Sequence, residues 1–199
     1  DVAEGLDWST SYAIEHGVQD YVWDADGLGL GLRRDVAENL KGQNITQHAF
    51  RGGETAARPK AMYEPILDNA AQARSNEDAF RNKRSQFYAI LRDRMYRTYK
   101  AVEKGEYHDP DEMISFSSNI KEMQVLRSEL CRIPQKLNGN GKFQIMSKID
   151  MKRLLQIDSP NMADAVMMSL SISDKIVNNN VYIPPVIKQM GQRHGSRRN

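Results

Sequence analysis

Two aspartates, Asp24 and Asp26, follow a run of aromatic and β-branched residues that predicts a strand over Asp20–Asp24. On an extended chain, side chains two residues apart point the same way, so these carboxylates would repel each other unless a cation or a proton intervenes. The carboxyl end of a strand is also where α/β sheets place their sites. Asp-x-Asp is common by itself, but this position makes both residues candidate metal ligands.

A third carboxylate, Asp164, lies in the first turns of a largely apolar segment that begins at Ser159 and predicts a helix. Ala163 and Ala165 beside it indicate close packing, and a buried carboxylate needs a partner because its desolvation is costly. The alternative is an acid that only favours the positive end of a helix dipole, worth ~0.3–1 kcal/mol. Asp164 is therefore a second candidate for chemistry, far from Asp24 in the sequence.

The glycine-rich segment 26–31 imitates a nucleotide-binding fingerprint without completing it. The pattern G-x-G-x-x-G would need glycine where Leu32 or Arg34 stands, and no glycine-rich stretch ends in Gly-Lys-Ser/Thr. We therefore expect a tight turn that packs a helix closely on the preceding strand. The four histidines show no metal-ligand spacing, Cys131 is expected to serve packing, and no nucleophile elbow marks a serine-histidine-acid triad.

The elements around these residues alternate between helix and strand. In order, we expect a short helix from Asp7 or Ser9 to Gly17, the strand Asp20–Asp24, a helix from Leu32 to about Gly42, and a strand from Asn44 to Phe50. This order is typical of a layered α/β fold with parallel strands.

The remainder of the chain predicts a loop followed by mainly helical structure. Residues 51–76 predict a long loop with one helical turn near 65–71, and residues 77–103 predict a long helix with an apolar stripe and many cations. Further expected elements are a helix start at 109–112, a helix over 119–130, a hairpin formed by 131–137 and 142–147, and helices over 150–156 and from 159 onward. Residues 178–199 predict a cationic, disordered tail.

Composition excludes several classes of protein. The 199 residues are 40% apolar and 27% charged, which is typical of a globular chain with one large domain. The longest apolar runs are far shorter than the ~20 residues of a membrane helix, and no signal peptide is visible. The single cysteine excludes a disulfide framework.

The charges are divided unevenly along the chain. Residues 1–80 carry a net charge of −7 and residues 81–199 one of +9. This division suits a protein that gathers cations on one side and polyanions on the other. Uneven surface decoration without any function is the alternative.

Five blocks, in a fixed order, carry a resemblance to one protein family. They are Asp7-Trp8-x-Thr10-Ser11-x-Ala13-Ile14; Tyr21-x-Trp23-Asp24-x-Asp26-Gly27-x-Gly29-x-Gly31-Leu32-Arg33-Arg34; Asp78-x-Phe80-Arg81-Asn82-Lys83-Arg84-x-Gln86-Phe87-Tyr88; Gly105-Glu106-Tyr107-x-Asp109-Pro110-Asp111; and Ser159-Pro160-Asn161-x-Ala163-Asp164-Ala165. Together they resemble the large terminase subunits of tailed bacteriophages, most closely the headful-packaging type of short-tailed phages. The resemblance covers the C-terminal nuclease part and runs from Asp1 to about Ser171.

The resemblance implies a ribonuclease H-like α/β fold, with a central mixed sheet flanked by helices. Residues 1–177 would form a partial nuclease domain that lacks the opening strands of the fold, and residues 178–199 would form the basic tail. Three acids around two Mg²⁺ or Mn²⁺ ions are the implied site. The second acid falls on Asp24 and the third on Asp164; Asp26 would be an outer ligand, and Lys148 matches a lysine near the active site of close relatives.

The first acid of the implied site has no clear counterpart. Only 23 positions separate Asp1 from Asp24, too few for the three strands that the family places between these acids. We therefore expect the first acid upstream of Asp1, and we expect this chain alone to cut weakly or not at all. Asn161 stands where some terminases carry a histidine, so no histidine role is transferred.

The implied function is endonucleolytic cutting of concatemeric double-stranded viral DNA during headful packaging, in the host cytoplasm. Implied partners are double-stranded DNA, the terminase small subunit, the portal protein and an N-terminal ATPase domain of the same subunit, with no membrane. Six cations would hold DNA phosphates without reading sequence, namely Arg81, Lys83, Arg84, Arg92, Arg94 and Arg97.

Two alternatives stay open. A non-catalytic module that binds DNA or docks the motor on the portal would keep the fold and the basic face without cutting. An unrelated α/β hydrolytic or nucleotide-binding domain would use Asp24 and the glycine turn, but the incomplete fingerprint and the five ordered blocks count against it.

Overall fold

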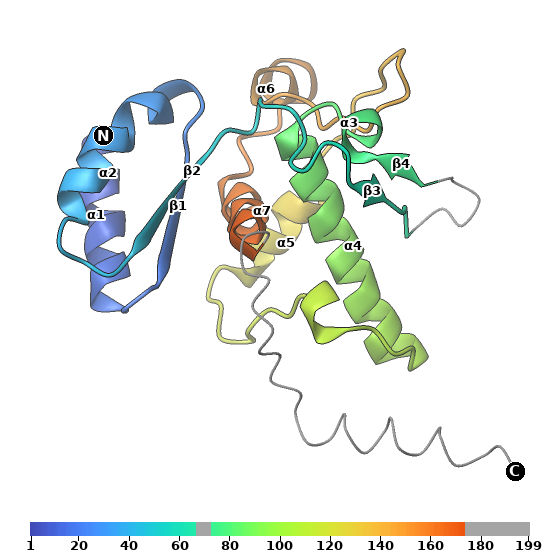
Figure 1. Ribbon diagram of the computed structural model, residues 1–199, viewed down its shortest axis with the longest axis horizontal. Helices are drawn as coiled ribbons and strands as arrows, with labels where there is room; N and C mark the ends of the chain where they lie inside the picture. Colours follow the sequence, from blue (N-terminus) through green and yellow to red (C-terminus); the bar gives the residue numbers. More distant parts are fainter. Residues whose placement is uncertain (67–72, 174–199) are drawn as a thin grey trace, which may run out of the picture.

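The computed structural model describes residues 1–66 and 73–173 of the chain, which form an α/β fold (Figure 1). The elements are α1 (Val2–Glu15), β1 (Asp20–Asp24), the 3-10 helix η1 (Gly27–Leu32), α2 (Arg33–Asn39), β2 (Thr46–Phe50), β3 (Met62–Tyr63), β4 (Arg74–Ser75), α3 (Asn76–Ala79), α4 (Lys83–Lys104), the 3-10 helix η2 (Pro110–Glu112), α5 (Met123–Cys131), α6 (Lys148–Leu155) and α7 (Asn161–Ser173).

The strands β1 and β2 run parallel and form the centre of a layered arrangement, as the sequence predicts. Trp23 packs with Leu6 of α1 on one face of the pair, in a core shared with α2. Val22 and Phe50 contribute to the main core, which includes side chains of α4 and α7. Figure 1 shows the same layers, with α1 and α2 on one side of the strands and α7 on the other. Because side chains alternate between faces, Asp24 shares the α7 face with Val22.

The sheet is smaller than the expected central mixed sheet. Within the described residues, β1 and β2 form a two-stranded parallel sheet, and β3 pairs with β4 in a separate antiparallel one. The β3–β4 pair was not expected, since its strands have only two residues each, too few for a period-2 pattern. The α/β class is confirmed, whereas the broad sheet is present only in part.

The first helix begins earlier than its sequence suggests. It starts at Val2 because Asp1 is its N-cap, with Asp1 Oδ1 accepting a hydrogen bond from Ala3 N at 2.7 Å. Asp7 and Ser9, expected as caps, lie inside the helix instead. Asp1 therefore precedes a helix rather than lying on a strand.

The long helix expected over 77–103 is interrupted. Residues 76–79 form α3, the next three residues are not helical, and α4 starts after Asn82, whose side chain caps it by accepting from Ser85 N at 3.0 Å. The interruption lets Phe80 pair with Phe143 in an isolated bridge. A contact between residues so distant in sequence cannot be read from helical periodicity.

Several other predicted elements are shorter in the structure than the sequence suggests. The acidic start at 109–112 yields only the single turn η2, and the helix expected from 119 begins at Met123. The expected hairpin around 138–141 is reduced to one isolated antiparallel bridge between Gln135 and Ile145. The helical turn predicted near 65–71 lies mostly outside the described residues, and the tail predicted at 178–199 lies wholly outside them. None of the helices in residues 1–66 and 73–173 combines the length and apolar character needed to cross a lipid bilayer.

Candidate active site

Asp24 is held at the carboxyl end of β1 by the turn that follows it. Its Oδ1 accepts a hydrogen bond from Asp26 N at 3.1 Å, and its carbonyl group lies against Gly29 of η1. A Cβ atom at Gly29 would stand 1.7 Å from Asp24 O, so only glycine fits this close approach. The glycine turn thus positions the last strand residue, in line with the expected close packing.

Asp26 is placed differently from Asp24. Its Oδ2 accepts a hydrogen bond from Gly53 N at 2.9 Å, which ties the turn after β1 to the loop after β2. Asp24 and Asp26 nevertheless line the same pocket of about 680 Å³. Each carboxylate of the Asp-x-Asp pair therefore accepts a backbone hydrogen bond, and Asp24 additionally contacts Lys148 of α6 (Lys148–Leu155) through its Oδ2.

Asp164 is 5% exposed and lies in the first turn of α7. Its Oδ1 accepts hydrogen bonds from Tyr88 Oη at 2.6 Å and from Arg84 Nη2 at 3.3 Å, both on α4. Its Oδ2 is buried and accepts no hydrogen bond of good geometry from a described residue. The burial expected from the neighbouring alanines is present, and so is a charged partner.

Lys148, the first residue of α6, brings the two distant aspartates together. Its Nζ lies 3.2 Å from Asp24 Oδ2 and 2.9 Å from Asp164 Oδ2, so the two carboxylate oxygens are at most about 6 Å apart. Burial lowers the pKa of Lys148, but the Asp164 and Asp24 carboxylates raise it by more, and the net pKa lies above its usual 10.5. A permanent cation thus stands between two carboxylates at neutral pH.

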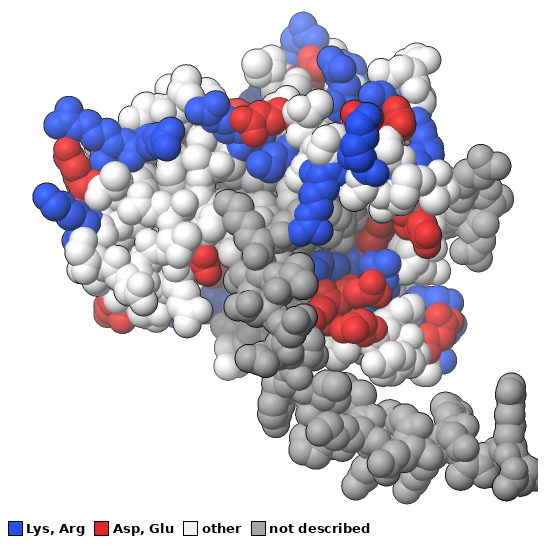
Figure 2. All heavy atoms as spheres, in the orientation of Figure 1, with Lys and Arg blue, Asp and Glu red and all other residues white. Residues whose placement is uncertain are grey.

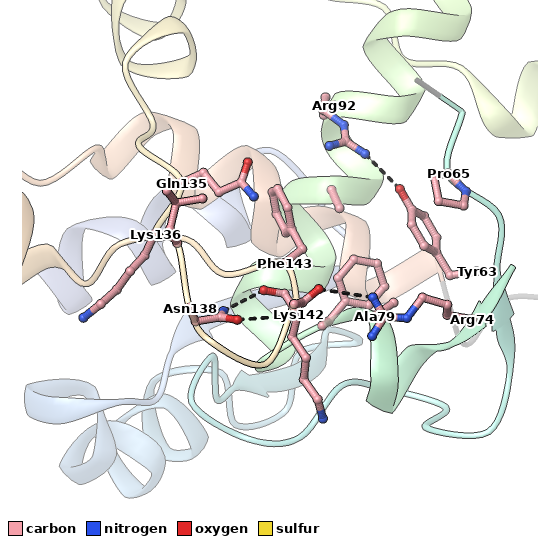
Figure 3. Close-up of a pocket in the computed structure, with 14 residues that line it drawn as sticks. Tyr63, Pro65, Arg74, Ala79, Arg92, Gln135, Lys136, Asn138, Lys142 and Phe143 are labelled. Atoms are coloured by element: carbon pink, nitrogen blue, oxygen red, sulfur yellow. Dashed lines mark hydrogen bonds between the residues drawn. The ribbon is translucent and has the colours of Figure 1, made fainter. Parts of the chain in front are cut away.

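A second pocket, of about 390 Å³, lies between the β3–β4 pair and the loop around residue 138 (Figure 3). No carboxylate lines it, and Figure 3 shows Arg92 and Tyr63 pointing toward one another across one side. Its other cations contact the chain itself: Arg74 donates to Gly141 O and Lys142 to Glu77 O. This pocket offers no converging acids, so the pocket of Asp24 and Asp164 is the better candidate for chemistry.

Solved structures resemble most of this chain in fold and sequence. The nuclease domain of the large terminase subunit gp2 of bacterial virus Sf6 matches with a TM-score of 0.77 and 47% sequence identity, over 84% of this chain and 71% of that chain. The chain belongs to the nuclease domains of phage large terminase subunits. Single-site variants of the Sf6 domain match equally well, one with manganese and β-thujaplicinol (TM-score 0.78) and one with calcium (0.76), both at the same identity and coverage. No family model and no curated protein matches the sequence.

The cations predicted to bind DNA in this terminase domain mostly contact its own polar groups. The contacts are Lys83 to Glu54 at 3.8 Å, Arg92 to Asp93 at 2.8 Å, Arg94 to Met113 O at 3.1 Å and Arg97 to Glu112 at 3.4 Å. Arg81 is exposed, and Arg84 lies in the acidic site. On the side of the molecule drawn in Figure 2, acidic side chains lie among the lysines and arginines. DNA phosphates would therefore compete with internal partners, and the DNA-binding role stays a prediction.

The sequence did not indicate that Tyr88 and Arg84 lie in the site. The two residues are four positions apart on α4, so they share one helix face, and a buried Asp164 was expected to need a partner. Both signals were present, but only the fold brings α4 against α7. The roles assigned to Asp24, Asp26, Lys148 and Asp164 also stay predictions, although the structure gathers these side chains in one pocket.

Lys148→Met is expected to lower the stability of the ion-free terminase domain by about 1–2 kcal/mol, because Asp24 and Asp164 then face each other without the ammonium. The cost is smaller than for a fully buried pair since the Lys148 side chain is 39% exposed. The stabilisation is complete below pH 10.5 and is lost as the pH rises through the raised pKa of Lys148. Urea unfolding at pH 7 measures the loss of stability. Lys152→Met is the control, because Lys152 is an exposed lysine of the same helix. Equal losses of stability in the two variants would contradict the bridging role of Lys148.

Proposed function

We propose that this chain is the metal-dependent endonuclease part of a phage DNA-packaging terminase, and that it cuts concatemeric double-stranded viral DNA during headful packaging. One observation carries the proposal. Asp24 and Asp164 come from opposite ends of the sequence, and their Oδ2 atoms face the same small volume, which now holds the Lys148 ammonium. Two carboxylates around one cation are the core of a site for a divalent ion.

The residues present fit a hard divalent cation. Asp164 Oδ2 is a buried anionic oxygen whose described partner is the Lys148 ammonium at 2.9 Å, so this oxygen already faces a position that a cation occupies. Carboxylate oxygens are the ligands that Mg²⁺ and Mn²⁺ prefer. Mn²⁺ and Ca²⁺ are present in structures of the similar Sf6 domain. We therefore propose two Mg²⁺ or Mn²⁺ ions, with Asp24 and Asp164 as ligands and Asp26 as an outer ligand.

Each side chain has a distinct part in this proposal. When bound, a pair of divalent ions can activate a water and stabilise the leaving oxygen of a phosphodiester. Asp24 and Asp164 supply the anionic oxygens that hold the ions beside the DNA backbone. Lys148 offsets part of the negative charge of the two acids in the ion-free protein, and it has to withdraw from Asp164 Oδ2 when an ion binds, so it competes with the metal.

Retention of DNA is proposed to rest on backbone phosphates rather than on bases, because headful cutting requires little sequence choice. The cations Arg81, Lys83, Arg92, Arg94 and Arg97 are the proposed contacts, with partial release from their internal partners. The terminase small subunit, the portal protein and an ATPase domain of the same subunit are the proposed protein partners.

Mn²⁺ binding tests the proposal directly. Asp24→Asn and Asp164→Asn are each expected to weaken Mn²⁺ binding by at least roughly 10- to 100-fold, the usual cost of disturbing even the outer shell of a metal site. Titration of the chain with Mn²⁺, followed by the electron paramagnetic resonance of the unbound ion, gives the affinity. Asp7→Asn is the control, because Asp7 pairs with Asn39 on α2 instead. Unchanged affinity in both site variants would refute the metal site.

The non-catalytic module remains the second candidate, for one specific reason. Within residues 1–66 and 73–173, no group of three or more histidine, cysteine, aspartate or glutamate side chains could hold a metal ion. Two carboxylates bind a pair of divalent ions poorly without a further ligand. This candidate predicts DNA binding without cutting in every form of the protein.

A further inference from the structure

The two oxygens of Asp164 have different surroundings. Oδ1 accepts the Tyr88 hydroxyl at 2.6 Å and the Arg84 guanidinium at 3.3 Å, whereas Oδ2 accepts no hydrogen bond of good geometry from a described residue. Oδ2 is the atom that faces Lys148 and, beyond it, Asp24. The Asp164 carboxylate therefore presents Oδ2 to the pocket, whereas Oδ1 accepts hydrogen bonds from two side chains of α4.

Tyr88 is a buried residue of α4 that lies behind Asp164. It lies one helical turn after Arg84 on α4, is only 6% exposed, and packs its ring 5.1 Å from the Arg84 guanidinium carbon. Burial, followed by the Asp164 carboxylate, raises the pKa of Tyr88 well above its usual 10.0. Because a carboxylate oxygen can only accept, the Tyr88 hydroxyl donates its hydrogen bond to Asp164 Oδ1 at 2.6 Å.

Resting on the proposed function, we infer that Tyr88, together with Arg84, is a positioning residue that fixes the rotation of the Asp164 carboxylate. The clamp on Oδ1 leaves Oδ2 alone to coordinate the ion. Without the clamp, the carboxylate can turn about its Cβ–Cγ bond and reorient both oxygens, which costs the site its preorganised geometry. Neither Tyr88 nor Arg84 touches the ion or the DNA in this arrangement.

The chain contains a matched arrangement outside the site. Tyr63 donates to Asp93 Oδ2 at 2.7 Å, and Arg92 contacts both residues, at 2.9 Å and 2.8 Å. Asp93 is 3% exposed, and burial with the Asp93 carboxylate raises the pKa of Tyr63 as well. The same tyrosine–aspartate–arginine chemistry therefore occurs twice, and only one copy faces the proposed ion. Tyr63→Phe is the control for Tyr88→Phe.

The experiment measures Mn²⁺ affinity by electron paramagnetic resonance for the unmodified chain, Tyr88→Phe, Tyr63→Phe and Asp164→Asn. Loss of the Tyr88 hydroxyl is expected to weaken Mn²⁺ binding by roughly 10- to 100-fold, the range typical of partners that orient a metal ligand. Tyr63→Phe is expected to lower stability comparably and to leave Mn²⁺ binding unchanged. Arg84→Lys keeps the positive charge but loses the planar fork, so it should weaken binding in the same direction.

Each outcome decides a separate point. If Asp164→Asn weakens binding and Tyr88→Phe does not, the clamp is refuted and the metal site stands. If Tyr88→Phe and Tyr63→Phe weaken binding equally, the effect is one of general stability, and the clamp is also refuted. If Asp164→Asn has no effect, the proposed function itself fails. Should Tyr88→Phe not fold, Arg84→Lys gives the result, with unchanged affinity counting against the clamp.

Discussion

Asp24→Asn and Asp164→Asn are each expected to abolish the nicking of supercoiled plasmid in Mn²⁺ or Mg²⁺. Asparagine keeps the size of aspartate but removes the charge that holds a divalent ion, so the loss should exceed the roughly 10- to 100-fold typical of outer-shell changes. Asp26→Asn should have a smaller effect, because Asp26 Oδ2 is already engaged by Gly53 N. Agarose gels of supercoiled and nicked plasmid over a range of metal concentrations give the rates.

Two forms of the protein make this result interpretable. The sequence-based expectation puts the first acid before Asp1, so the rates are measured both in the chain from Asp1 to Asn199 and in a longer form that includes preceding residues. Stronger cutting by the longer form is expected. Equal cutting by both forms would mean that the third ligand lies within this chain, and absence of cutting in both would favour the non-catalytic module.

Gly29→Ala is expected to destabilise the domain by about 3 kcal/mol or more, at the upper end of the cost of overpacking. The added Cβ would lie 1.7 Å from the carbonyl oxygen of Asp24, and backbone cannot yield as a flexible side chain can. The end of β1 would have to move, so Mn²⁺ affinity should fall together with stability. Guanidinium unfolding and the Mn²⁺ titration measure the two effects.

Gly31→Ala is the matched control for this change. It lies in the same 3-10 helix, but an added Cβ there has no atom within 4 Å, so stability should change by no more than about 0.5 kcal/mol. Equal stability of the two variants would show that the glycine turn does not set the position of Asp24.

The sequence predicted the local part of the site well. β1 ends at Asp24 as expected, because the aromatic and β-branched run has one clear boundary at the glycine turn. The meeting of Asp24 with Asp164 of a later helix was implied only by the family resemblance. In the structure, α7 packs against β1 and Lys148 contacts both aspartates. The end of β1 depends on nearby residues, whereas the meeting of the two acids depends on the fold.

The sequence could not predict which charged side chains pair within the protein and which face solvent. Arg84 was predicted, with five other cations, to contact DNA, yet it forms an ion pair with Asp164. Arg92 pairs with Asp93, and Arg97 pairs with Glu112. Likewise, the break before α4 coincides with a bridge between Phe80 and Phe143, which are distant in the sequence. Contacts between distant segments decide these points, and neither composition nor helical periodicity reports them.

The most direct test of the shared metal site is the position of Mn²⁺ in crystals of this chain, located by its anomalous scattering. The predicted result is a peak in the pocket within about 2.0–2.6 Å of both Asp24 Oδ2 and Asp164 Oδ2, the range for oxygen ligands of hard divalent ions. Lys148 Nζ should have moved away from Asp164 Oδ2. Mn²⁺ bound elsewhere, with Lys148 still bridging the two aspartates in a crystal saturated with the ion, would contradict the assignment.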